Sequence, residues 1–211
     1  MSVVFSAAAS VEILDGVAAA LLAATACVRA RNFGAHFTGA MVLGCLCGIA
    51  CGLSREIFLN GSAGARLILP ALPGSALAGA IGGALAARIL AAKKDRVFFW
   101  LDAASLGLAT SLGAILALPG LGVVGAVALA LISGLAPSAI RDVCLGDVAM
   151  IVDKSWYAAA AALGAVASVA VVIGGLVIDE IAFARMGEYA ALFGTGVVVA
   201  IRGWKGRKEE V

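Results

Sequence analysis

Charged residues are scarce in this chain: Asp, Glu, Lys and Arg make up 13% of 211 residues, where a soluble domain carries nearer a quarter. Histidine is nearly absent as well. The single histidine, His36, has no serine, cysteine or acid arranged around it. The sequence also has no phosphate-binding loop, so we expect no enzyme. The net charge of +2 and the absence of a basic stripe argue against a nucleic-acid partner.

Metal-ligand clusters are also missing. The five cysteines lie within predicted helices, and although Cys47 and Cys51 share a helical face, no histidine or carboxylate accompanies them. We predict no metal site and no cofactor. Close helix packing by a small residue is the simpler role for these cysteines.

Hydrophobic residues dominate instead, at 63% of the chain with a mean hydropathy of +1.10. Uncharged runs cover Asn32–Ser54, Leu67–Ala87, Ala103–Ile140 and Ser155–Ile178. Runs of this length are typical of membrane-spanning helices. The run at 103–140 is long enough for two helices, and Pro119-Gly120 supplies a turn between them. The first 28 residues lack a basic start, so a cleaved signal peptide is not expected.

These runs predict an all-α membrane protein that forms a single transmembrane domain over residues 1–211. Helices are expected near 6–28, 34–59, 72–92, 98–118, 121–146, 156–178 and 187–204. The last has an uncharged core of only 13 residues, Tyr189–Ile201, or about 20 Å against a bilayer core of about 30 Å.

Basic residues predict the orientation. With the N-terminus outside and seven crossings, twelve face the cytoplasm and three face out. If the last helix did not cross, the split would be eight against seven. We therefore predict seven crossings with the C-terminus cytoplasmic. The inner set is Arg29, Arg31, Arg88, Lys93, Lys94, Arg96, Arg141, Lys154, Arg202, Lys205, Arg207 and Lys208; the outer set is Arg55, Arg66 and Arg185.

A repeat relates the two halves of the chain. GIACGLSRE at 48–56 matches GLAPSAIRD at 134–142 when Arg55 is placed on Arg141, and LD at 14–15 matches LD at 101–102. Because each unit has three crossings, the second enters the membrane from the opposite side. We predict a first repeat over 1–95, an inverted second repeat over 96–178, and a seventh helix with a basic tail over 179–211.

Glycine spacing predicts how the helices pack. Gly44, Gly48 and Gly52 form one stripe, and Gly79 and Gly83 form another. Small residues at this spacing let helix backbones approach closely. Packing within one subunit is the simpler interpretation, and contact between subunits is the alternative.

The matched segments fall about 18 Å into the bilayer, near its centre. Pro137 cannot donate to the carbonyl of Ser133 and should kink the fifth helix, whereas Gly48 and Gly52 loosen the second without forcing a kink. Freed carbonyls at this depth need water, a side chain or a cation. The predicted pore and gate residues are Gly48, Ala50, Cys51, Gly52, Ser54, Arg55, Ser133, Gly134, Ala136, Pro137, Ser138 and Arg141.

Two roles are open for the charged residues of these segments. Arg55 and Arg141 either line a watery vestibule as a gate, or extend to the interface and pair with the neighbouring Glu56 and Asp142. Asp15 and Asp102 either support the site or sit in a first helical turn, where the helix dipole favours an acid.

With seven crossings, the LD openings and the pattern G-x-x-x-G-[IL]-A-small-small-x-x-R-[DE], the chain resembles prokaryotic trimeric intracellular cation (TRIC) channels over nearly its whole length. The glycine triplets usual in that family read Ala50-Cys51-Gly52 and Ala136-Pro137-Ser138 here. The resemblance implies a homotrimer in the plasma membrane of a prokaryote. It also implies passive flow of K+ or another monovalent cation through a hydrated pore in each subunit, with membrane lipid as a further partner.

Two other functions remain open from the residues. A secondary transporter for a small solute such as glycine would use the same inverted repeat and midplane breaks. Against it, the sequence offers no acid in a spanning segment well away from a helix end. A packing or assembly subunit without flux is the third reading.

Overall fold

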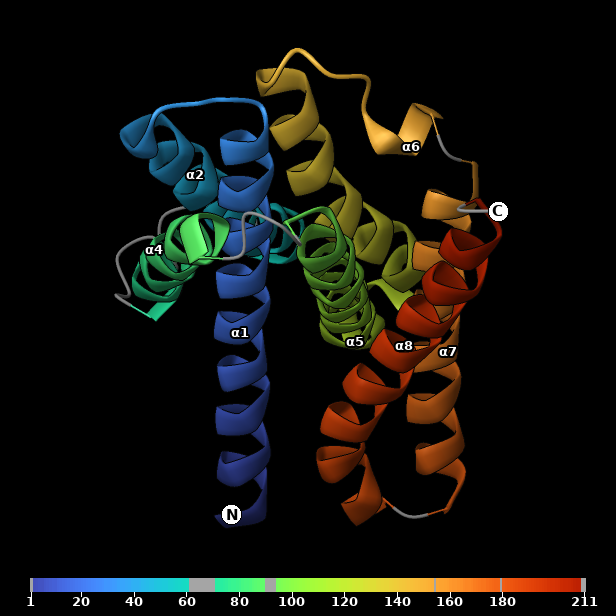
Figure 1. The fold of residues 1–211 in the computed structure, drawn as a ribbon. Helices are drawn as coiled ribbons and strands as arrows, with labels where there is room; N and C mark the ends of the chain where they lie inside the picture. Colours follow the sequence, from blue (N-terminus) through green and yellow to red (C-terminus); the bar gives the residue numbers. More distant parts are fainter. Residues whose placement is uncertain (1, 61–70, 90–93, 154, 179, 210–211) are drawn as a thin grey trace.

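The structure, a computed structural model, describes residues 2–60, 71–89, 94–153, 155–178 and 180–209, and all of its regular elements are helices (Figure 1). The prediction of an all-α fold is confirmed. The elements are α1 (Ser2–Asn32), α2 (Phe37–Asn60), α4 (Ala71–Ile89), α5 (Lys94–Cys144), the short α6 (Met150–Asp153), α7 (Ser155–Ile178) and α8 (Glu180–Glu209). Residues 90–92 of the predicted third helix, and Arg66, Lys93 and Lys154 of the charge count, lie outside the described residues.

Helix α5 contains the fourth and fifth predicted helices and turns back on itself between them (Figure 1). The turn is at Gly122, with φ 65° and ψ −176°, and not at Pro119-Gly120 as the sequence suggested. The physical reason is that the fixed φ of Pro119 suits a helix. The positive φ and extended ψ at Gly122, in contrast, are open almost only to glycine. The predicted crossings thus correspond to α1, α2, α4, the two halves of α5, α7 and α8.

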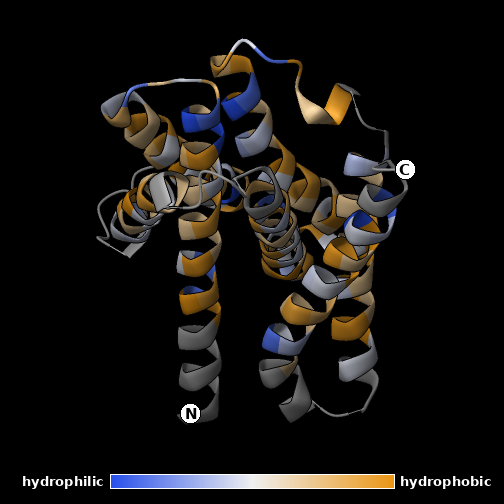
Figure 2. Cartoon of the chain, in the orientation of Figure 1, coloured by the Kyte–Doolittle hydropathy of each residue, from blue (hydrophilic) through white to orange (hydrophobic). Residues whose placement is uncertain are grey.

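Length and composition make four of the described helices suitable for crossing a membrane, and Figure 2 shows hydrophobic residues along most of their length. The apolar segments are Val11–Asn32, Phe37–Leu59, Phe98–Cys144 and Trp156–Gly175, of which the third, with 47 residues, is long enough for two spans. A shorter apolar stretch, Pro73–Ala87, lies in α4. The chain is a multi-pass membrane protein. Helix α8 forms as predicted but is not among these four.

Helix α1 packs against α2, α4 and α5, and α7 packs against α5 and α8. Glycines set the close approach in the first group. A Cβ atom at Gly48 would lie 2.7 Å from the carbonyl oxygen of Ala19, and one at Gly83 would lie 2.6 Å from the Cα of Ala24. Gly44 and Gly79 face α1 in the same way. The predicted glycine packing within one subunit is confirmed at these four positions.

Candidate functional site

Arg55, late in α2, is buried inside the helix bundle and pairs with Asp15 of α1. Its side chain is 2% exposed, and its Nη2 donates to Oδ1 of Asp15. The Nε atom donates to the carbonyl of Cys51 at 3.3 Å, and the Ser54 hydroxyl donates to the same carbonyl at 2.8 Å. Side chains thus satisfy the backbone at the predicted break of α2.

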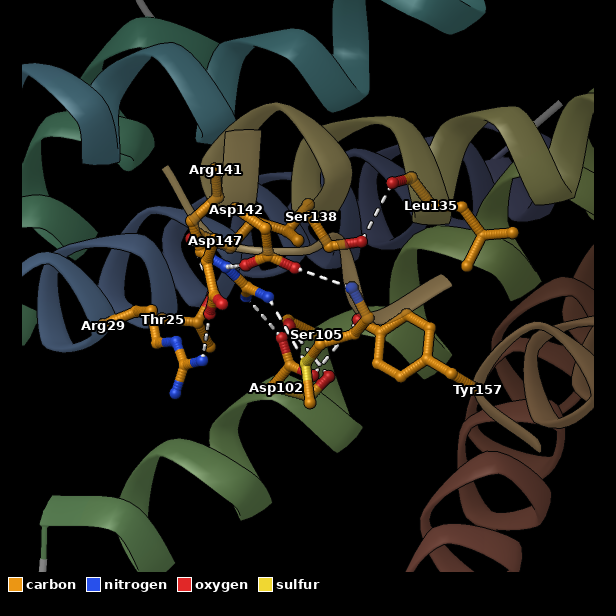
Figure 3. Close-up of polar contacts among 12 residues, drawn as sticks. Thr25, Arg29, Asp102, Ser105, Leu135, Ser138, Arg141, Asp142, Asp147 and Tyr157 are labelled. Carbon is orange, nitrogen blue, oxygen red and sulfur yellow. Dashed lines mark hydrogen bonds and ion pairs between the residues drawn. The ribbon is translucent and has the colours of Figure 1, made fainter. Parts of the chain in front are cut away.

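Arg141, at the matched position of α5, forms the matching pair with Asp102. Its Nη1 donates to Oδ1 of Asp102 at 2.6 Å, and both side chains are 1% exposed. The Nε atom donates to Asp142 at 2.7 Å (Figure 3). Separations of 40 residues between Arg55 and Asp15 and 39 between Arg141 and Asp102 reproduce the repeat in three dimensions.

These pairs overturn two of the simpler interpretations. Arg55 and Arg141 do not extend to the interface, because both are buried and bind an aspartate on another helical segment. Asp15 lies 13 residues after the first residue of α1, and Asp102 lies 8 residues after the first residue of α5. Neither is in a first turn, so the helix-dipole explanation is wrong. Glu56 is also buried, at 7% exposure.

An outer layer covers the Arg141 pair on the side of the α5–α6 loop. The ring of Phe98 contacts two guanidinium groups, with the Cζ of Arg141 5.0 Å and that of Arg29 5.1 Å from its centre. Arg29 donates to Asp147 at 2.6 Å, and these two side chains are about a quarter exposed (Figure 3). Asp142 also accepts from the backbone N–H of Met150, which ties the loop to the pair.

Sequence reasoning missed two further partners of Asp102. Arg202 of α8 donates from Nη1 to Oδ2 at 2.6 Å, and the hydroxyl of Tyr157 on α7 donates to the same oxygen at 3.1 Å. Arg202 is 0% exposed, although the charge count used it as one of the basic residues on the cytoplasmic side. An arginine directly after the apolar core of α8, on a chain with so few charges, was the available signal.

The predicted break regions of α2 and α5 meet at one point. Cys51 and Ser133 are both buried, and their Sγ and Oγ atoms are 3.6 Å apart. Nearby, Gly134 packs on Thr110, because a Cβ atom there would overlap the methyl group of Thr110. The remaining predicted residues flank these: Gly52 is buried, while Ala50 and Ala136 are partly exposed. The structure therefore brings the predicted segments together as a packed contact.

Pro137 does not interrupt α5, which is helical through Cys144, and Gly122 is the residue with non-helical dihedral angles within it. Pro137 is buried one residue before Ser138, whose hydroxyl donates to the carbonyl of Leu135 at 2.9 Å. Such back-bonding is tolerated in helices and often bends them. Helix α2 is likewise continuous from Phe37 to Asn60, so neither predicted break is a gap in the helix.

This is the fold of an all-helical membrane protein with buried, matched ion pairs at equivalent points of its two halves. Solved structures share it. The chain is similar to a prokaryotic TRIC channel crystallised in 0.5 M KCl, with a TM-score of 0.78 and 20% identity over 92% of this chain and 96% of the other. It is similar also to the TRIC trimeric intracellular cation channel orthologue from Rhodobacter sphaeroides, with a TM-score of 0.78 and 26% identity over 92% and 95%.

A third structure, from work on conductance through TRIC cation channels, has a TM-score of 0.71 and 20% identity over 93% of each chain. A family model described as Glycine transporter matches residues 99–173. No curated protein sequence gave a significant match. The chain has the fold of the prokaryotic TRIC channels, so the resemblance seen in the sequence is confirmed. These structural neighbours are channels, not enzymes.

Proposed function

We propose that this protein is a channel for monovalent cations, chiefly K+, through which ions flow passively down their gradient. The main support is the fold, shared over 92–93% of the chain with proteins described as TRIC cation channels. By the same likeness we propose a homotrimer in the plasma membrane of a prokaryote, with the N-terminus outside and a pore within each subunit.

The path is expected where α2 meets the second half of α5. The Cys51–Ser133 contact and the two buried arginines lie on these segments. Equivalent pairs in the two halves support an inverted repeat over 1–95 and 96–178 around this path. Packed side chains at the contact correspond to a closed state in our proposal. Moving one arginine charge across 100 mV contributes about 2.3 kcal/mol, which is enough to bias a gate.

The test is a planar bilayer recording with the purified full-length protein under a K+ gradient. We expect unitary current steps whose reversal potential follows the K+ gradient, and no current when choline replaces K+ on both sides. A reversal potential that follows the anion, or a bilayer without current steps at any voltage, would reject a cation channel.

A second candidate, a carrier for a small solute such as glycine, is favoured by the family match at 99–173. The structure adds that Asp15 and Asp102 are buried acids within the apolar segments Val11–Asn32 and Phe98–Cys144. Buried acids of this kind serve proton coupling in many transporters. Saturable uptake of labelled glycine into proteoliposomes, without current steps in bilayers, would favour the carrier over the channel.

A further inference from the structure

Asp102 is shared by two buried arginines from different parts of the chain. Its Oδ1 atom accepts from Arg141 of α5, and its Oδ2 atom accepts from Arg202 of α8, each at 2.6 Å. Exposure is at most 1% for all three side chains. One carboxylate therefore holds two cations, and Asp142 supplies the second negative charge of the cluster.

The two arginines are held differently. Three aromatic rings surround the guanidinium of Arg202: those of Tyr157, Phe99 and Trp156 lie 4.8, 5.2 and 5.8 Å from its Cζ atom. Stacking on several rings fixes a guanidinium in place. Its Nε and Nη2 atoms are buried and make no hydrogen bond within the part of the chain that the structure describes. Asp102 is thus the carboxylate on which Arg202 depends.

Arg141 has a carboxylate that moves with it. Asp142 is the next residue, and its Oδ1 accepts from Nε of Arg141 at 2.7 Å. If the contact between Arg141 and Asp102 opens, Arg141 keeps Asp142 and Asp102 keeps Arg202. Every buried charge then still has an opposite charge beside it. This matters because an isolated charge inside a membrane protein is strongly destabilising.

We propose that Arg202 is a positioning residue for the gate: it holds Asp102 so that Arg141 can leave that carboxylate without stranding a charge. This rests on the proposed function. Helix α8 reaches the second half through the bond from Arg202 to Asp102. Without Arg202, Asp102 would depend on Arg141, and the closed contact would be favoured.

The first test measures gating in the full-length protein. Arg202→Gln is expected to lower the open probability about tenfold at a given voltage, the ratio that corresponds to about 1.4 kcal/mol. Unitary conductance should not change. Arg202→Lys keeps the positive charge, so its open probability should be closer to that of the native protein. Lys205→Gln is the matched control, because it removes the same charge from an exposed position on the same helix.

The second test needs no current and measures the thermal unfolding midpoint, Tm. Arg141→Gln should lower Tm in the native background, where Asp142 loses its bond from Arg141 but Arg202 still neutralises Asp102. In the Arg202→Gln background the drop should be at least twice as large, and in the Lys205→Gln background it should be unchanged. If the doubly substituted protein does not fold, the Arg202→Lys background serves instead, and there Arg141→Gln should cost about as much as in the native protein.

The outcomes separate the two proposals. If Arg141→Gln lowers Tm equally in the native and Arg202→Gln backgrounds, Asp102 is not shared between the two arginines, whatever currents are seen. Non-additive drops with an unchanged open probability in Arg202→Gln would overturn the role in gating. Absence of current from the native protein would reject the channel and the gating role, while non-additive drops would still establish the shared carboxylate.

Discussion

Arg141 and Asp102 lie on the two arms of the bent helix α5 and form an ion pair. Nη1 of Arg141 is 2.6 Å from Oδ1 of Asp102, and both side chains are 1% exposed. The turn of α5 at Gly122 lies 20 residues after Asp102 and 19 before Arg141. At 1.5 Å per residue each arm is about 30 Å long, which is the thickness of the bilayer core. The ion pair therefore joins the two arms of α5 at the end opposite the turn.

Arg141→Ala should flatten the voltage dependence of the open probability, because it removes the charge that we expect to move. The protein should still fold, since Arg202 continues to neutralise Asp102. Current–voltage relations in planar bilayers measure the effect. The control is Arg31→Ala, at the end of α1, where the side chain donates to the carbonyl of Ala35. An unchanged relation in Arg141→Ala would remove this residue from the gate.

Pro137→Ala should lower unitary conductance, because an alanine N–H can bond the carbonyl of Ser133 and straighten α5. Since the backbone is already helical at this position, Tm should stay the same or rise. Replacing a proline inside a helix by alanine stabilises the folded state by up to about 3 kcal/mol. Single-channel recordings and thermal unfolding measure the two effects. Pro119→Ala, at the other proline of α5, is the control. Full conductance in Pro137→Ala would show that the proline does not shape the path.

Gly83→Ala and Gly82→Ala should have opposite effects on stability. A Cβ atom at Gly83 meets the backbone of Ala24, whereas at Gly82 it meets nothing within 4 Å. We expect Gly83→Ala to cost about 1–3 kcal/mol by overpacking, and Gly82→Ala to add about 0.4–1 kcal/mol. Unfolding in detergent measures both. Equal effects at the two positions would mean that α1 and α4 do not pack as described.

Asp15→Asn should destabilise the protein by about 3–5 kcal/mol, because it leaves the buried charge of Arg55 without its carboxylate. Adding Arg55→Met to this variant should recover part of the loss. Denaturant unfolding of the single and double variants provides the comparison. A double variant that is less stable than Asp15→Asn alone would indicate that Arg55 stabilises the bundle by other contacts.

The sequence predicted both segments that meet in the candidate site but only one of the ion pairs there, between Arg141 and Asp142. The repeat matched Arg55 with Arg141 and Asp15 with Asp102. In the structure these four residues form two ion pairs, Arg55 with Asp15 and Arg141 with Asp102. The predicted pairing with the neighbouring acid is found for Arg141 and Asp142, but the pairs with Asp15 and Asp102 were not predicted. Proximity in sequence favours that neighbour, whereas burial favours whichever carboxylate the helix packing brings to the guanidinium.

The amino-acid sequence by itself determined that the fold is all-helical and where most of the helices lie, since backbone hydrogen bonding within lipid is local and requires long uncharged runs. Only the tertiary structure decided where α5 turns, which glycines touch a neighbouring backbone, and that Arg202 reaches Asp102 from 100 residues away. The physical reason is that these features depend on how the helices cross. Crossing is set by side-chain packing between segments distant in the chain, which no local pattern records.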